Sequence, residues 1–244
     1  MVKTEEMMKR LFVVFLLMAA FSQGMRAGMA SQYQFTGFSP DGRYAALEYW
    51  GIADGSGFPY IALMVFDCQN NVFAEPLYFK MDQNTDLVPG EEAYSHMRDL
   101  YSQEIEEILR KYSIYRLNRG KLLYQKKEED YPVTGLEFKV GEKRVSLRFE
   151  EYPGEISFYD MFTPSGFRLY TAFNGKERLV YAHTPAEEVG DFKFNYELQR
   201  VVAFDKTLLL LFTHQIPGFE GPDTVPVILG DLFPISLSGE EVME

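Results

Sequence analysis

The stretch LQRVVAFDKTLLLLFT, residues 198–213, carries the strongest indication of the fold. Two apolar segments, Leu198–Phe204 and Thr207–Thr213, are separated only by Asp205-Lys206, which predicts a tight turn between antiparallel strands. The run Leu208–Phe212 is apolar at every position, whereas a strand with one face in water alternates apolar and polar residues. The sequence therefore predicts a hairpin whose second strand is central in its sheet.

Strand signals separated by turns dominate the rest of the chain as well. Asn174-Gly175, the strongest hairpin signal, favours a type I′ turn between strands at residues 166–173 and 176–182. The chain is 46% hydrophobic and 16% aromatic, which suits strands because flat rings pack well on a pleated surface. Further strands are predicted at residues 33–38, 43–50, 60–67, 72–79 and 227–237, with loops at 51–57, 121–130 and 217–226.

A second hairpin can be predicted down to its register. Gly141-Glu142 has glycine in the first position, as a type II′ turn requires. With a two-residue turn there, Phe138 faces Val145 and Leu136 faces Leu147. Both apolar pairs then fall on one face of the hairpin, so the turn and the hydrophobic pattern agree.

One amphipathic helix is predicted at about residues 91–112. It follows Pro89-Gly90, and its apolar residues recur with the helical period of 3.6. The stripe consists of Tyr94, Met97, Tyr101, Ile105, Ile108, Leu109 and Tyr112. Such a stripe is typical of a helix packed on a core.

Together these elements predict a mainly β fold, either all-β or α+β. Antiparallel hairpins and meanders are expected to form a β-sandwich or a propeller-like stack, with the helix packed against it. No segment has the composition of a linker, so residues 31–244 are expected to form a single domain.

The N-terminal segment has the pattern of an export signal. Lys9-Arg10 precedes the eleven apolar residues 11–21, a length that suits a signal peptide and is short for a membrane span. We expect residues 1–30 to be removed, with cleavage after Ala30 preferred over cleavage after Gly24, and Met8 is a candidate start. The predicted location is the periplasm or the extracellular space, without stable membrane insertion after cleavage.

Charge and residue counts exclude several classes of function. The net charge of −12 disfavours nucleic acid as a partner, because like charges repel. Cys68 is the single cysteine, so no intramolecular disulfide forms. The three histidines, His96, His183 and His214, are dispersed without the spacing of metal ligands, and neither a metal nor a cofactor is predicted.

Two sequence resemblances accompany these patterns. The segment Phe38–Tyr44, FSPDGRY, resembles the turn that leads into the inner strand of TolB-like β-propeller blades. Together with Glu48–Tyr60 and Gly218–Asp223, it also resembles the bacterial predicted secreted protein family, domain of unknown function 2259. That resemblance implies export and brings no activity, cofactor or catalytic residue.

Two glycine-rich loops are the candidate contact surface, and they are expected to come together in the fold. They combine carboxylates and aromatic rings with glycines, a composition that suits recognition of a peptide or a sugar. The candidate binding residues are Asp54, Ser56, Phe58, Tyr60, Phe219, Glu220 and Asp223, with Phe58, Tyr60 and Phe219 expected to be exposed. The favoured function is that of a non-catalytic binding or accessory protein of the cell envelope, whose ligand or protein partner the sequence does not identify.

Other readings of these residues stay open. A secreted hydrolase would use loop carboxylates, drawn from Glu48, Asp54, Glu220 and Asp223. Asp54 and Ser56 supply fewer oxygens than a calcium loop needs, and a His214–Asp223–Ser56 assembly has no supporting spacing. A purely structural envelope component is the third alternative.

Overall fold

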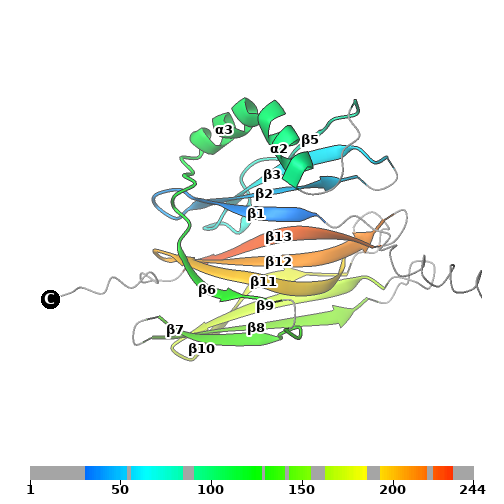
Figure 1. Cartoon of the computed structure of the whole chain (residues 1–244). Coiled ribbons are helices and arrows are strands. Elements are labelled where there is room, and N and C mark those ends of the chain that lie inside the picture. Colours follow the sequence, from blue (N-terminus) through cyan, green and yellow to red (C-terminus); the bar gives the residue numbers. More distant parts are fainter. Residues whose placement is uncertain are drawn as a thin grey trace, which may run out of the picture.

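The chain folds into stacked antiparallel sheets with helices on one side. The computed structural model describes residues 31–53, 56–84, 91–127, 130–140, 143–154, 163–185, 193–218 and 222–232. In this part of the chain, three sheets and a helical layer lie one above another (Figure 1). The predicted mainly β architecture is confirmed, and its arrangement is a stack of three meanders.

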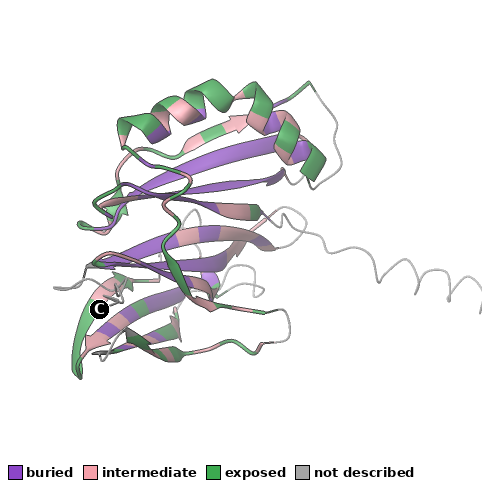
Figure 2. Ribbon diagram, turned by 60° about the vertical axis from the view of Figure 1, so that its left-hand side comes forward, coloured by how far each residue is buried: buried purple, intermediate pink, exposed green. Residues whose placement is uncertain are grey.

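The helix-covered sheet comes first along the chain. It contains β1 (Gln32–Phe38), β2 (Tyr44–Ile52), β3 (Pro59–Asp67), β4 (Val72–Phe73) and β5 (Tyr78–Met81). Strands β1, β2 and β3 form a meander, and both β4 and β5 pair with β3. All nine residues of β3 are buried, because helices cover one face of the strand and the next sheet covers the other (Figure 2).

The central sheet contains the stretch with which the sequence analysis began. It has the order β13 (Pro222–Leu232), β12 (Thr207–Pro217), β11 (Phe194–Phe204) and β6 (Lys121–Gln125). Leu208, Leu210 and Phe212 pack toward one neighbouring sheet, and Leu209 and Leu211 toward the other. The prediction of a central strand apolar on both faces is confirmed.

The outer sheet is a four-stranded meander on the far side of the central sheet. It has the order β10 (Lys176–His183), β9 (Ser165–Phe173), β8 (Lys143–Pro153) and β7 (Gly135–Val140). The predicted pairs Phe138 with Val145 and Leu136 with Leu147 are both present. The turn at Asn174-Gly175 joins β9 to β10 with positive φ at both residues, as a type I′ turn requires.

The predicted single helix is wrong in one respect, because two helices follow each other here. They are α2 (Glu91–Leu100) and α3 (Ser102–Lys111), and the chain bends between them at Tyr101. The Ser102 hydroxyl donates a hydrogen bond to the Asp99 carbonyl oxygen at 3.1 Å, an interaction that favours a bend. The apolar stripe is buried as predicted, with Met97, Ile105 and Leu109 against the helix-covered sheet.

Other boundaries also differ from the predictions. Residues 72–79 form two short strands, because Pro76 has no N–H to continue the ladder. Residues 121–125, predicted as a loop, pair with β11 as strand β6. Residues 222–226, predicted as a loop, begin β13 although they include Pro222 and Pro226, which an edge strand tolerates.

A polar junction ties the three sheets together at one side. Asn71, in the turn after β3, donates from its side-chain amide to the Val180 carbonyl oxygen in β10 at 3.0 Å. Its side-chain oxygen accepts the Gly230 N–H of β13 at 3.1 Å. Nearby, the Thr171 hydroxyl of β9 donates to Asp231 at 2.6 Å. This junction fixes the edge of β13 between the other two sheets.

Candidate functional site

A β-bulge near the start of β11 lies beside a hollow in the described structure. The pairing with β12 shifts between Phe194, opposite Gln215, and Glu197, opposite Thr213. One extra residue is thereby accommodated in β11, and Asn195 takes a positive φ of 53°. Because bulges redirect side chains and are common beside functional sites, the surroundings of Asn195 are a candidate functional site.

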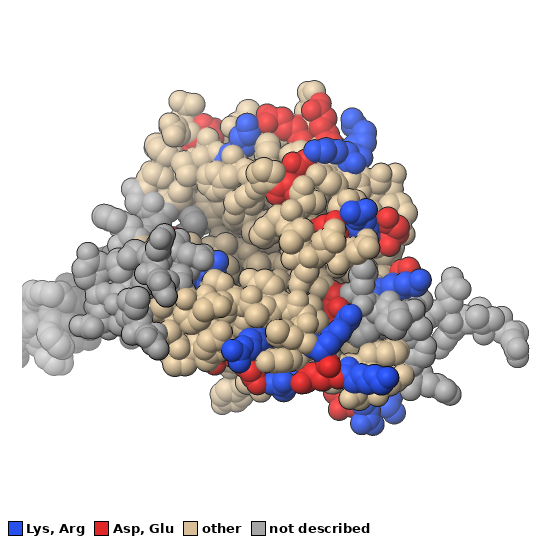
Figure 3. Space-filling view, turned by 180° about the vertical axis from the view of Figure 1, so that it is seen from behind, with Lys and Arg blue, Asp and Glu red and all other residues tan. Residues whose placement is uncertain are grey.

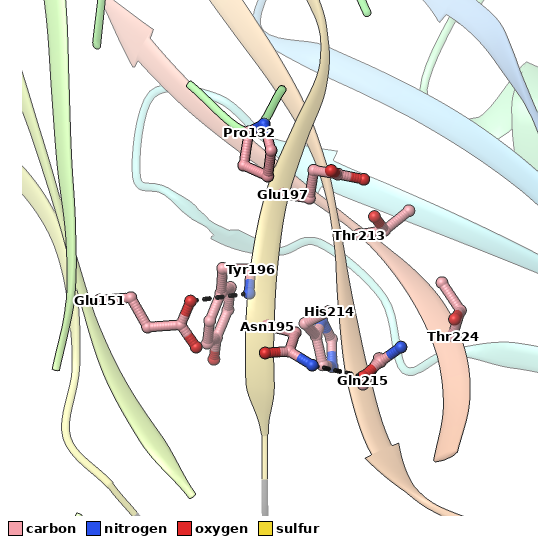
Figure 4. A pocket seen from close by; sticks show the side chains of 9 residues that line it. All are labelled: Pro132, Glu151, Asn195, Tyr196, Glu197, Thr213, His214, Gln215 and Thr224. Carbon is pink, nitrogen blue, oxygen red and sulfur yellow. Dashed lines mark hydrogen bonds between the residues drawn. The ribbon is translucent and has the colours of Figure 1, made fainter. Parts of the chain in front are cut away.

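The bulge lies in the wall of a polar cavity of about 380 Å³, which we call the polar mouth (Figure 4). The ends of β8, β11, β12 and β13, together with Pro132 in the segment before β7, contribute its side chains. They are Pro132, Glu151, Asn195, Tyr196, Glu197, Thr213, His214, Gln215 and Thr224. The set contains hydrogen-bond donors, acceptors and two carboxylates, so the polar mouth is suited to polar ligand groups.

Hydrogen bonds hold several of these groups in place. A carboxylate oxygen of Glu151 accepts the Tyr196 backbone N–H at 3.1 Å, and the Asn195 amide donates to the Gln215 side-chain oxygen at 2.6 Å (Figure 4). Glu197 forms an ion pair with Lys126 at 2.9 Å. The first bond links the outer sheet to the bulge of the central sheet.

An apolar chamber of about 220 Å³ adjoins the polar mouth. Tyr196 and His214 line both hollows and therefore form the boundary between them. Their rings stack at a centroid distance of 5.4 Å, and Tyr196 also stacks on Phe167 at 4.5 Å. The rest of the lining comes from all three sheets and the approach to β11: Tyr49, Met64, Phe73, Leu77, Tyr181, Lys193, Phe212, Val225, Pro226, Val227 and Leu229.

Large apolar side chains are exposed where the chamber meets the surface. We call Phe73, Leu77 and Phe79 the rim; they are between 44% and 53% exposed. Phe73 and Leu77 belong to both the rim and the lining of the chamber. The molecule carries uncharged side chains across the hollowed middle of one face, with most of the charged residues at the margins (Figure 3).

The structure brings together two of the residues predicted from the glycine-rich loops. Ser31 connects the starts of β3 and β13, since its side-chain oxygen lies 2.7 Å from the Tyr60 hydroxyl and its N–H donates to the Thr224 carbonyl oxygen at 3.3 Å. Asp223 is close enough to Tyr60 to act on its pKa. Thr224 and Val225, which follow Asp223, line the two hollows.

Tyr60 itself is not the exposed ring that was expected. It is 1% exposed, because it lies on β3, whose two faces are both covered. Burial, the largest influence, raises the pKa of Tyr60 to about 12, with a smaller contribution from Asp223. Tyr60 therefore acts as a structural residue, stacked on Phe79 at 5.4 Å.

The other predicted site residues have different outcomes. Ser56 is exposed and its hydroxyl accepts the Phe58 N–H at 3.4 Å, while Phe58 is half-buried. Asp223 is 8% exposed. Asp54, Phe219 and Glu220 lie outside the described residues, as does the predicted signal peptide, residues 1–30.

Glu48, a member of the predicted hydrolase set, lies in a different environment from Asp223. It is fully buried beneath the helices, where its carboxylate contacts Arg98 at 3.2 Å and Arg116 at 2.8 Å. Both arginines also pair with Glu106, at 2.6 and 3.0 Å, which closes a ring of four charged residues. A buried carboxylate paired in this way is a structural residue that depends on both arginines, and it is out of reach of a substrate.

Sequence reasoning singled out neither Tyr196 nor Glu151, and considered His214 only among the dispersed histidines and in an assembly with Asp223 and Ser56. The segment Phe194–Glu197 lies just before the strand predicted at Leu198–Phe204, and no motif in it indicated a site. A non-glycine residue with positive φ creates the bulge, and asparagine adopts that conformation more readily than most residues. Asn195 was therefore the one weak signal available.

Metal binding and thiol chemistry find no support in the described parts of the chain. No group of three His, Cys, Asp or Glu side chains there is arranged to hold a metal ion. Burial raises the pKa of the Cys68 thiol to about 12, which keeps it protonated and unreactive. Neither α2 nor α3 has the length and apolarity needed to cross a membrane.

The fold and the site together define a mainly β protein of three stacked sheets with a two-part cleft at a bulge. The chain belongs to the family described as "Predicted secreted protein (DUF2259)", whose match covers residues 46–230. That range includes the outer sheet, the lining of the cleft and all of the central sheet except the last two residues of β13, and it confirms the family resemblance. Comparisons with curated proteins and with solved structures gave no match.

Proposed function

We propose that this protein is an exported, non-catalytic binding protein of the cell envelope, which holds its ligand in the polar mouth and the apolar chamber together. The observation that carries this proposal is the joining of the two hollows at Tyr196 and His214. An apolar cavity beside a few fixed polar groups is the usual composition of a ligand site. The ligand would place an apolar group in the chamber and polar atoms in the mouth.

The environments of the acidic residues support binding over catalysis. Glu48 is sealed beneath the helices, Glu151 accepts a backbone N–H, and Glu197 is paired with Lys126. The hydrolase alternative depends on Asp54, Glu220 and Asp223. If it holds, Glu220→Gln or Asp223→Asn abolishes turnover and leaves binding intact, because an acid or base group acts on the transition state.

Export is part of this proposal and has its own test. Lys9→Glu combined with Arg10→Glu removes the positive charge before the apolar segment and is expected to block secretion. N-terminal sequencing of protein from the periplasm and from the medium should find a start near Ser31 and decide between the two compartments. Soluble cytoplasmic protein that retains Met1 or Met8 would contradict export.

Binding can be tested with N-acetyl-L-phenylalaninamide, a neutral probe with one aromatic ring and two amides. By the usual binding energy per atom of small ligands, we expect a Kd in the millimolar range, measured by NMR titration. Val225→Phe fills the chamber and should weaken binding at least tenfold, whereas Val72→Phe, the same change outside the lining, should not. Absence of binding, or equal binding by both variants, would contradict the proposal.

A further inference from the structure

The rim around the chamber is more apolar than a small-ligand site requires. Phe73, Leu77 and Phe79 are close in sequence, belong to the same edge of the helix-covered sheet, and are each about half exposed. Contiguous exposed apolar patches are uncommon on proteins that act alone, and they mark surfaces that another molecule covers. A small molecule that fills the chamber would leave Phe79 in water, because Phe79 does not line the chamber.

A polypeptide segment can fill the chamber and cover the rim at the same time. One large side chain can enter the chamber while the adjoining chain lies over the rim. The chamber's 220 Å³ is sufficient for an aromatic ring, since an apolar cavity of about 150 Å³ holds benzene. The polar mouth offers amide and hydroxyl groups from Asn195, Gln215 and Thr213, which suit the donors and acceptors of a peptide backbone.

Charge at the mouth indicates what accompanies that side chain. Among the described residues, Glu151 and Glu197 are the charged residues of its lining, and no described lysine or arginine contributes to it. Lys126 balances Glu197, whereas the exposed Glu151 shares its carboxylate with a neutral backbone N–H. A cationic group is therefore favoured beside Glu151, and a carboxylate or phosphate is disfavoured.

We infer that the occupant of the cleft is an extended segment of another polypeptide, with a large aromatic side chain in the chamber and a neighbouring lysine or arginine at Glu151. This inference rests on the proposed binding function and specifies its ligand. The chamber holds the aromatic side chain, the rim is covered by the adjoining peptide, and the polar mouth favours a positively charged side chain.

Three capped hexapeptides test the inference by calorimetry against N-acetyl-L-phenylalaninamide. The first contains Phe-Lys in an otherwise alanine sequence, the second replaces phenylalanine with alanine, and the third replaces lysine with glutamate. The first should bind at least tenfold tighter than the small probe, and each replacement should weaken binding about tenfold. The loss on changing lysine to glutamate should shrink at high salt, because salt screens exposed charges.

Two protein variants test whether the rim and Glu151 cause these differences in peptide affinity. Phe79→Ser should weaken the first hexapeptide several-fold and leave the small probe unchanged, because Phe79 belongs to the rim and does not line the chamber. Glu151→Gln should reduce the preference for lysine over glutamate. If the small probe binds and the hexapeptide binds no tighter, the inference fails and the proposed function stands; if neither binds, both fail. Unchanged peptide affinity in both variants would also overturn the inference.

Discussion

The acidic residues beneath the helices and those at the polar mouth have similar chemistry and opposite environments. Glu48 is fully buried and enclosed by Arg98 and Arg116, whereas Glu151 is exposed and shares its carboxylate with a backbone amide. Removing a charge from water costs several kcal/mol, so Glu48 requires its arginines to be tolerated at all. Glu151 stays hydrated and has capacity left for a partner. The comparison shows that location, more than residue type, separates structural carboxylates from those available to a ligand.

The largest effect is expected from Glu48→Gln, which leaves Arg98 and Arg116 facing a neutral side chain in the interior. Loss of one partner from a buried ion pair destabilises by about 3–5 kcal/mol, to be measured by urea denaturation. Glu106→Gln is the matched control from the same ring. Its side chain is 46% exposed, so its cost should stay below about 1 kcal/mol. Equal stabilities of the two variants would remove the distinction between sealed and hydrated carboxylates.

A second expectation concerns the apolar packing that seals Glu48. Ile105→Asp places a charge between α3 and the helix-covered sheet and should cost about 3 kcal/mol. Gln103→Asp, on the exposed side of the same helix, should cost little. Thermal melting of both variants against the wild type measures the difference. An unchanged melting temperature for Ile105→Asp would show that the helices do not seal this layer.

An intermediate effect is expected at the junction of the three sheets. Asn71→Ala removes the hydrogen bonds to Val180 and Gly230 and also places alanine at a φ of 58°, so a loss of about 1–3 kcal/mol is expected in urea denaturation. Asn71→Gly removes the same hydrogen bonds and relieves the backbone strain. The difference between the two variants measures the cost of the backbone conformation alone. If both match the wild type, the junction contributes no stability.

Much of the layered sheet architecture could be predicted from the sequence, because it depends on the local periodicity of apolar residues. The run Leu208–Phe212 has no polar position, and this directly reports that both faces of β12 are covered. The pairing of Leu136 with Leu147 was fixed by a two-residue turn. In both cases the residues that decide the structure are neighbours in sequence or lie across one short turn.

The features that the sequence did not predict depend on contacts between segments that are far apart in the chain. Pro222 and Pro226 are ordinary loop signals, and they fit a strand only because β13 is at the edge of its sheet. The partners of Glu48 are 50 and 68 positions further along the chain, at Arg98 and Arg116. The cleft joins side chains from the three sheets, so no single stretch of sequence carries its pattern.

The smallest expected effect on stability is that of Glu151→Gln. This variant tests most directly whether the carboxylate of Glu151 differs in role from that of the buried Glu48. The glutamine oxygen can still accept the Tyr196 N–H, and the position is exposed, so the free energy of unfolding should change by no more than about 0.5 kcal/mol. The same substitution at Glu48 should cost several times more. Urea denaturation of the two variants side by side tests this contrast, independently of any ligand. A large loss at Glu151 would mean that its carboxylate charge holds the bulge in place, and the polar mouth would then be a structural feature in the same sense as the ring around Glu48.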